Sequence, residues 1–193
     1  HLLASFGTEV LAGYGIGARL EFMLTSLAFA VGIASVPMIG MAIGARRIAR
    51  ARRIAWISGG VSFAVVGLFG CFFAIWPDLW VNLFTDNAAV RAAGRQYLSI
   101  AAPFFAFVGL SVSLYFSSQG AAAVLSPVLA QTARLVFVVA GGSWLIAHGA
   151  NGTHFFWLAA ASMILLGTLA AAAVHFTNWG RERRQSLPSE GLC

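Results

Sequence analysis

The stretch FMLTSLAFAVGIASVPMIGMAIGA, from Phe22 to Ala45, decides the fold class because it contains no charged side chain. A helix crosses a hydrocarbon core about 30 Å thick with about 20 apolar residues. The stretch is long enough for one crossing, and other charge-free runs cover 54–76, 96–133 and 135–180. The sequence therefore predicts an all-α integral membrane protein.

The whole composition agrees with this prediction, since 60% of the 193 residues are hydrophobic and only 9% are charged. Turn-forming residues at 117–120 and 148–154 divide the two longest charge-free runs. We expect one transmembrane bundle over 1–180 and a cytoplasmic tail over 181–193. The bundle should hold about five membrane-spanning helices, near 10–44, 54–76, 90–118, 122–147 and 153–178.

The basic residues, all of them arginine, indicate how the helices are oriented. Three lie in the tail and five form a positive cluster: Arg46, Arg47, Arg50, Arg52 and Arg53. Arginine-rich ends face the cytoplasm, and four predicted spans separate the two groups, so both can lie on that side. Such ends account for the basic pI, and we expect a lipid bilayer and no nucleic acid as the partner.

Two charged residues, Arg19 and Glu21, stand at the entrance of the first span. Residues two apart on a helix point about 200° apart, so the two side chains should have different surroundings. Glu21 lies 22 residues before Ile43, roughly 33 Å along a helix, which places it near the outer edge of the apolar layer. Both side chains could serve packing at that edge. Alternatively, Glu21 faces a cavity and binds a cationic substrate or coupling ion, with Arg19 tuning the charge.

Two prolines, Pro37 and Pro103, lie inside predicted spans, where each removes a backbone donor. We expect both to kink their helices, either as static bends or as part of a motion. Aromatic residues near the predicted span ends should form an interfacial belt; they are Trp76, Trp80, Tyr97, Trp144, Trp157 and Trp179.

The sequence contains no P-loop, GxSxG or HExxH motif and no cluster of metal-ligand residues with a recognised spacing. We therefore expect neither an enzyme nor a bound cofactor, and the sequence identifies no metal site. Coupling to an ion gradient remains open, since it needs only a few buried polar groups.

Several ordered blocks resemble the C-terminal half of the MATE (multidrug and toxic compound extrusion) transporters. Residues 12–21 and 34–45 resemble helix eight, 77–86 the stretch after helix nine, 97–105 the start of helix ten, and 118–127 with Arg134 the turn into helix eleven. The resemblance implies about five of twelve helices, or most of the C-terminal six-helix lobe. Because the chain starts at His1, we expect a fragment whose partner is a missing N-terminal lobe.

The resemblance also implies a function for the intact protein, namely efflux of small cationic or amphipathic compounds across the bacterial inner membrane. Inward Na⁺ or H⁺ would drive the exchange. Some family members carry a cation-binding carboxylate in helix ten, but 96–118 contains no acidic residue here. Two alternatives stay open: a lipid-linked oligosaccharide flippase of the same superfamily, which should carry more basic residues in its cavity, and an inactive truncated remnant.

Overall fold

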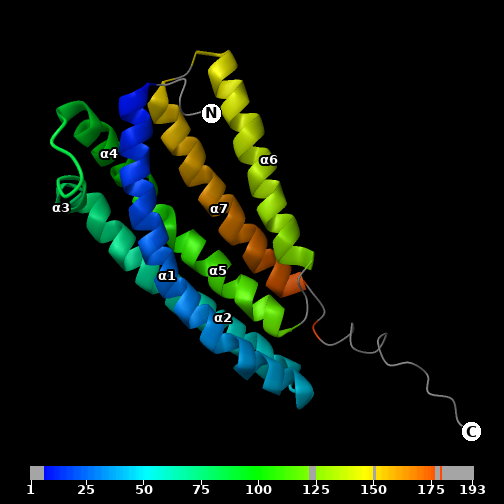
Figure 1. The fold of residues 1–193 in the computed structure, drawn as a ribbon. Helices are drawn as coiled ribbons and strands as arrows, with labels where there is room; N and C mark the ends of the chain where they lie inside the picture. The colour runs from blue at the N-terminus through cyan, green and yellow to red at the C-terminus, as the bar shows by residue number, and fades with distance from the viewer. Residues whose placement is uncertain (1–6, 122–124, 150, 177–178, 180–193) are drawn as a thin grey trace, which may run out of the picture.

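The computed structural model describes residues 7–121, 125–149, 151–176 and 179, and these residues form helices joined by short turns (Figure 1). The elements are α1 (Thr8–Gly44), α2 (Ile48–Ile75), α3 (Asp78–Val81), α4 (Ala88–Ala101), the 3₁₀ turn η2 (Ala102–Phe104), α5 (Phe105–Gly120), α6 (Leu125–Ala147) and α7 (Gly152–Phe176). The described part contains no strand and has five helical stretches long and apolar enough to cross a membrane, with α4 to α5 as one stretch. The predicted all-α membrane fold is confirmed.

Helix α5 occupies the middle of the bundle and packs against α1, α2 and α7. Helix α4 packs on the outer half of α1, while α6 packs mainly on α7. In Figure 1, α6 stands at one side of the bundle, on the other side of α7 from α1. One long face of α6 is therefore left open toward α1 and α5.

The helices turn small residues inward and large apolar residues outward, as membrane helices do when close packing holds them together. On α1 the buried stripe includes Gly13, Gly17, Ala28 and Gly32, whose spacings of 4, 11 and 4 residues keep them on one face of the helix. The outward side chains are large; Phe22 of α1 is 73% exposed. This distribution fits a chain surrounded by lipid rather than by water.

Helices α2 and α5 run antiparallel in close contact. Gly70 meets Phe105, Val66 meets Gly109, and the Ser58 hydroxyl lies 3.4 Å from that of Ser117. The Ser117 hydroxyl also lies 3.4 Å from that of Ser35 on α1. Hydroxyls from three helices thus meet at a buried junction that fixes α1, α2 and α5 relative to one another.

Two predicted boundaries differ from the structure. Helix α2 begins at Ile48 rather than near 54, because arginine is a good helix former and continues the helix beyond its apolar part. The predicted span 90–118 is interrupted by η2, which contains Pro103; proline cannot donate a backbone hydrogen bond and clashes with the preceding turn. The α-helix therefore breaks at Pro103, whereas α1 stays helical through Pro37. The predicted tail 181–193 lies outside the described residues.

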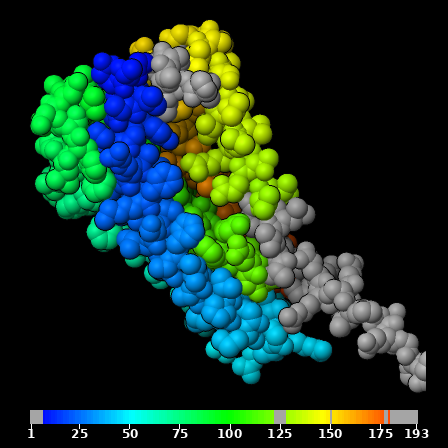
Figure 2. Space-filling view, in the orientation of Figure 1, coloured from blue at the N-terminus to red at the C-terminus, as the bar shows by residue number. Residues whose placement is uncertain are grey.

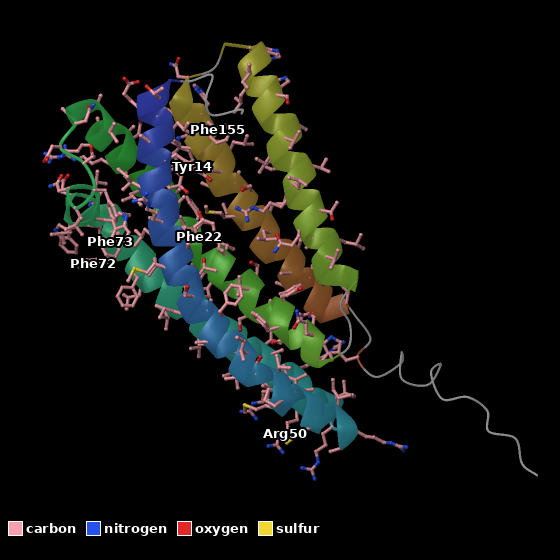
Figure 3. All side chains as sticks on the ribbon, in the orientation of Figure 1. Tyr14, Phe22, Arg50, Phe72, Phe73 and Phe155 are labelled. Atoms are coloured by element: carbon pink, nitrogen blue, oxygen red, sulfur yellow. The ribbon has the colours of Figure 1, made fainter. Side chains whose placement is uncertain are left out.

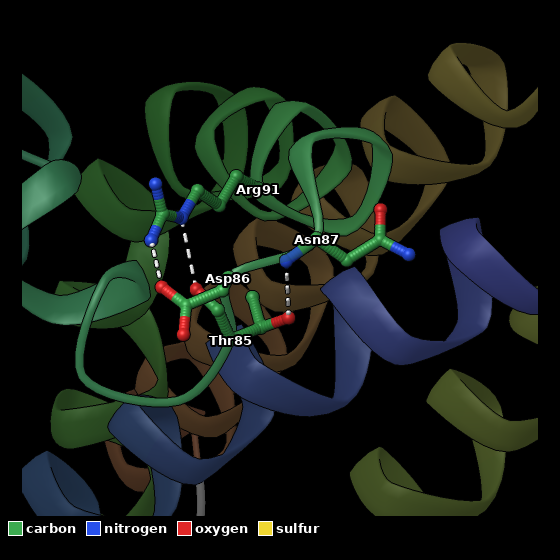
Figure 4. A network of polar contacts seen from close by, with 4 residues as sticks. All are labelled: Thr85, Asp86, Asn87 and Arg91. Carbon is green, nitrogen blue, oxygen red and sulfur yellow. Dashed lines mark hydrogen bonds and ion pairs between the residues drawn. The ribbon is translucent and has the colours of Figure 1, made fainter.

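The loop between α3 and α4 shows how the outer arginines are balanced (Figure 4). Arg91 forms an ion pair with Asp86 at 2.6 Å and donates from Nε to the Thr85 carbonyl at 2.8 Å. Arg95 is paired with Asp78 in the same way. Asn87 caps α4 by accepting hydrogen bonds from the backbone of its first turn. Both arginines of α4 thus have an acidic partner on the predicted outer side.

Candidate functional site

Glu21 projects from α1 toward α4 in a partly buried position. The Tyr97 hydroxyl of α4 donates a hydrogen bond to Glu21 Oε2 at 3.5 Å. The Glu21 carbonyl accepts a further bond from the Thr25 hydroxyl at 2.6 Å. A carboxylate away from bulk water is costly unless polar groups or cations face it. The Tyr97 hydroxyl is such a group for the Glu21 carboxylate, whereas the Thr25 bond is made to the helix backbone.

Tyr97 is held rigidly in this place, since its side chain is fully buried. Its ring contacts Tyr14 edge-on at 5.0 Å and Phe156 of α7 at 5.3 Å between centroids. Gly17 leaves the space for the ring, because a Cβ at that position would lie 2.2 Å from Tyr97 Cδ1. The aromatic packing and the glycine together fix the hydroxyl beside Glu21.

A positive charge reaches the same place from α6. Arg134 lies within electrostatic range of Glu21, Tyr14 and Tyr97, without a hydrogen bond or ion pair to any of these three described residues. Its Nε donates to the Ser162 hydroxyl of α7 at 3.4 Å. The Glu21 carboxylate and the phenols of Tyr14 and Tyr97 thus lie together between α1 and α4, with the Arg134 guanidinium within electrostatic range. We call these four residues the Glu21 cluster. Figure 3 shows Tyr14 on the upper part of α1.

Arg19 lies apart from this cluster, although it is two residues from Glu21. Its side chain is exposed, and its guanidinium carbon lies 5.3 Å from the centroid of the Phe84 ring, in a cation–π contact at the outer loop. The different surroundings of Arg19 and Glu21 follow from their spacing. A part for Arg19 in the transport pathway stays a prediction.

A pocket of about 330 Å³ opens between α1, α5 and α6, farther from the α3–α4 loop than the Glu21 cluster. It is lined by Phe29, Val112, Tyr115, Phe116, Val128, Gln131 and Thr132. The Phe29 and Phe116 rings meet edge-on at 5.2 Å. Phe29 is about two turns beyond Glu21 on α1, and Gln131 is about one turn before Arg134 on α6. The same two helices therefore line both the aromatic pocket and the Glu21 cluster.

Sequence reasoning singled out Glu21 and included Arg134 in the family resemblance, but it did not predict the two tyrosines near the carboxylate. The belt prediction was wrong for Tyr97, which is buried in the bundle core rather than set at an interface. Tyr14 and Tyr97 are 83 residues apart in the chain and meet only because α4 packs on α1. The one local signal was Gly17, whose place on the buried stripe marks a close approach.

The remaining candidates lie away from this site. Of the positive cluster, Arg46, Arg47, Arg50 and Arg53 are exposed, and the cluster gathers at the opposite end of the bundle from the α3–α4 loop (Figure 3). Within the described part of the chain, no group of three or more His, Cys, Asp or Glu side chains could hold a metal ion.

Comparisons with known proteins identify the family of the chain and several relatives. The MatE family model matches residues 1–144. The chain is 28% identical over 148 residues to a probable multidrug resistance protein NorM of Aromatoleum aromaticum, covering 75% of this chain and 32% of that relative. It is 28% identical over 175 residues to a protein of the same name from Deinococcus radiodurans, covering 88% of this chain and 39% of that relative.

A third protein of that name, from Neisseria meningitidis serogroup B, is 27% identical over 182 residues, which cover 90% of this chain and 37% of the relative. The chain thus spans between about a third and two fifths of the length of these curated relatives. No solved structure gives a significant match. Because the MatE model covers about three quarters of the chain, the chain belongs to the MatE family of multi-pass membrane transporters.

Proposed function

We propose that the chain is part of a multidrug antiporter of the bacterial inner membrane, which exports small cationic or amphipathic compounds in exchange for Na⁺ or H⁺. The names of the NorM relatives, probable multidrug resistance proteins, support the substrate class. The observation that carries the proposal is the Glu21 carboxylate, sequestered among helices beside an aromatic pocket. An acidic group inside a membrane bundle marks an ion or substrate pathway.

The Glu21 cluster suits the exchange of cations. The Glu21 carboxylate can take a proton, or it can coordinate Na⁺ together with neutral oxygens such as the Tyr97 hydroxyl. Arg134 supplies a fixed positive charge that balances the carboxylate when no cation is bound. An arriving cation then competes with this balance, so binding is strong enough to load the site and weak enough to release it.

The aromatic pocket suits the other half of the exchange. Phe29, Tyr115 and Phe116 offer ring faces to a flat or cationic compound, while Gln131 and Thr132 offer hydrogen bonds. The pocket lies between α1 and α6, the helices that also carry Glu21 and Arg134. A cationic substrate and the coupling ion would both bind between these helices and repel each other. Binding of one therefore weakens binding of the other, as antiport requires.

Alternating access requires a second lobe, since in repeat-built transporters one half rocks against the other around the site. The partner of this bundle is therefore a preceding N-terminal lobe in a longer chain. The flippase alternative is weaker, because a flippase should carry several basic residues in its cavity. Here Arg134 lies near Glu21, whereas Arg19 contacts Phe84 at the outer loop.

The test is transport by the full-length protein reconstituted in lipid vesicles. A fluorescent cationic dye is loaded, and a Na⁺ gradient or a pH gradient is imposed separately. We expect one of the two gradients to drive dye movement against its concentration, while empty vesicles show none. Dye movement that neither gradient accelerates would contradict the proposed antiport, and gradient-independent movement of a lipid-linked oligosaccharide would favour the flippase.

A further inference from the structure

A second pocket lies at the cytoplasmic end of the bundle, far from the Glu21 cluster, where α1 turns into α2. It has a volume of about 330 Å³ and is lined by Met38, Met41, Ala42, Ala45, Arg47, Arg50 and Ile54. Figure 2 shows this end of the bundle, formed by the last turns of α1 and the first turns of α2, at the lower right. We call it the α1–α2 pocket.

A tight turn brings the arginines of α2 beside the methionines of α1. Arg46 adopts a left-handed backbone conformation with φ 58°. The Arg46 N–H donates to the Ile43 carbonyl at 2.9 Å and the Arg47 N–H to the Ala42 carbonyl at 2.8 Å, which closes the end of α1. Glycine is the residue that adopts this conformation most easily, but the chain has an arginine there. The turn therefore carries a positive charge although the backbone of Arg46 is strained.

Arg47 and Arg50 lie at the N-terminal end of α2, where positive charges are unfavourable. Helix α2 begins at Ile48, and no side chain caps its first turn and no acidic residue lies in it. The N-terminus of a helix has a partial positive charge, so Arg47 and Arg50 repel it rather than balance it. Free backbone N–H groups and two guanidinium groups at one place together favour a bound anion.

No carboxylate in the described part of the chain can supply that anion. Its acidic residues are Glu9, Glu21, Asp78 and Asp86, and all four belong to the outer half of the bundle. The outer arginines Arg91 and Arg95 use Asp86 and Asp78 as partners. Arg47 and Arg50, both exposed, have no such partner among the described residues, and Figure 3 shows Arg50 at the lower end of the bundle.

The other wall of the pocket is apolar and faces outward. Met38 is 49% exposed and Met41 is 69% exposed, on the part of α1 that belongs to the charge-free span. A free phosphate or nucleotide gains nothing from such a wall. A molecule that joins an anionic head to a hydrocarbon chain matches both walls at once, and the cytoplasmic leaflet is rich in such molecules.

We propose that the α1–α2 pocket binds an anionic phospholipid of the cytoplasmic leaflet. The guanidinium groups of Arg47 and Arg50 hold the phosphodiester, and the acyl chain lies along Met38 and Met41. The bound lipid balances the charge at the start of α2 and ties the α1–α2 turn to the membrane surface. The proposal depends on the positive-inside orientation and does not depend on the transported substrate.

The test is native mass spectrometry of the full-length protein in detergent, incubated with phosphatidylglycerol or with phosphatidylcholine. The wild type should retain phosphatidylglycerol in preference to phosphatidylcholine. The double variant R47Q/R50Q should lose that retention by about fivefold or more. The matched double variant R46Q/R53Q removes two exposed arginines of the same cluster that do not line the pocket, and it should stay within about twofold of the wild type.

Each opposite result overturns the site. Equal loss in both double variants would show attraction to the whole arginine cluster rather than a pocket. Equal retention of the two lipids in the wild type would remove the preference for an anionic lipid. Displacement of phosphatidylglycerol by millimolar inorganic phosphate would identify a soluble anion as the ligand. The variant R47K/R50K keeps the positive charge and should retain part of the binding. Such retention would show that the protein tolerates substitution at both positions, so the loss in R47Q/R50Q would not come from unfolding.

Discussion

Glu21 owes its properties to residues that lie far from it in the chain. Tyr97, 76 positions later, supplies the hydroxyl that faces the carboxylate, and Arg134 supplies the nearby positive charge. Gly17, one helical turn before Glu21, supplies the space in which the Tyr97 ring fits. The site therefore depends on the close approach of α1 and α4 as much as on the carboxylate itself.

Enlarging Gly17 should disturb the site without touching Glu21. The added methyl of Gly17→Ala would meet the Tyr97 ring at 2.2 Å, so the ring and its hydroxyl must move away from Glu21. We expect ion-driven dye efflux to fall several-fold, and overpacking of this kind costs about 1–3 kcal/mol of stability. Gly15→Ala is the matched control, since no atom lies within 4 Å of its added methyl. Equal efflux in both variants would contradict the packing role of Gly17.

At this scale the sequence predicts the carboxylate but not its surroundings. Glu21 stands out because it lies beside a long charge-free run. The rotation of a helix by about 100° per residue also turns its side chain away from that of Arg19. Tyr97 resembles an interfacial anchor until α4 is placed against α1, because a tyrosine near the start of an apolar run fits either setting. The pairing of distant residues is a tertiary property that local patterns do not carry.

Among the elements, α2 makes a very close contact with the break at Pro103. Gly70 faces the Ala102 carbonyl of η2, and a Cβ at that position would lie 2.2 Å from this backbone oxygen. The break frees backbone carbonyls that α2 must cover, since no water reaches them within the membrane. A small residue at 70 therefore allows α2 to seal the interruption between α4 and α5.

The variant Gly70→Ala should consequently destabilise the bundle. A backbone oxygen cannot rotate away as a side chain can, so α2 must shift, at a cost of about 1–3 kcal/mol. We expect a lower midpoint in thermal unfolding of the purified protein in detergent. Gly60→Ala, on the same helix with no atom within 4 Å of the added methyl, should leave the midpoint unchanged or slightly higher. Equal midpoints of thermal unfolding in Gly70→Ala and Gly60→Ala would contradict the proposed close packing of α2 on the Pro103 break.

The elements themselves were predicted well in number and type, and their ends less well. The lengths of the apolar runs predict five spanning stretches. The thickness of the bilayer requires a minimum number of apolar residues in each spanning helix, and such runs can be counted in the sequence. It underestimates α2, whose first residues are arginines that belong to the helix but not to the apolar layer. The Pro103 break is predictable from the missing donor, whereas α3 is too short to leave a pattern.

The whole molecule is polarised along the membrane normal. Paired charges lie at the α3–α4 loop, and five arginines, Arg46, Arg47, Arg50, Arg52 and Arg53, gather at the turn between α1 and α2. Because positive residues tend to be retained in the cytoplasm during insertion, we predict that the arginine end faces inward. The distribution of charge, rather than its total, determines the orientation.

This orientation can be checked by cysteine labelling in a background without native cysteines. We expect H148C, in the turn between α6 and α7, to react with a membrane-impermeant maleimide in intact cells. We expect R46C, in the turn between α1 and α2, to react only after the membrane is permeabilised. Both positions are exposed, so access alone decides the result. The reverse pattern would mean that the bundle is inverted, and the lipid leaflet assigned to the α1–α2 pocket would change with it.

The most direct test of the central claim is ion-driven efflux by the Glu21→Gln variant of the full-length protein in vesicles. Glutamine keeps the size of the side chain but can neither take up a proton nor carry the charge that holds a cation. We predict that gradient-driven dye efflux falls roughly tenfold or more. The control Glu9→Gln, which changes an exposed glutamate at the start of α1, should transport as the wild type does. Unchanged efflux and unchanged ion dependence in Glu21→Gln would contradict the account.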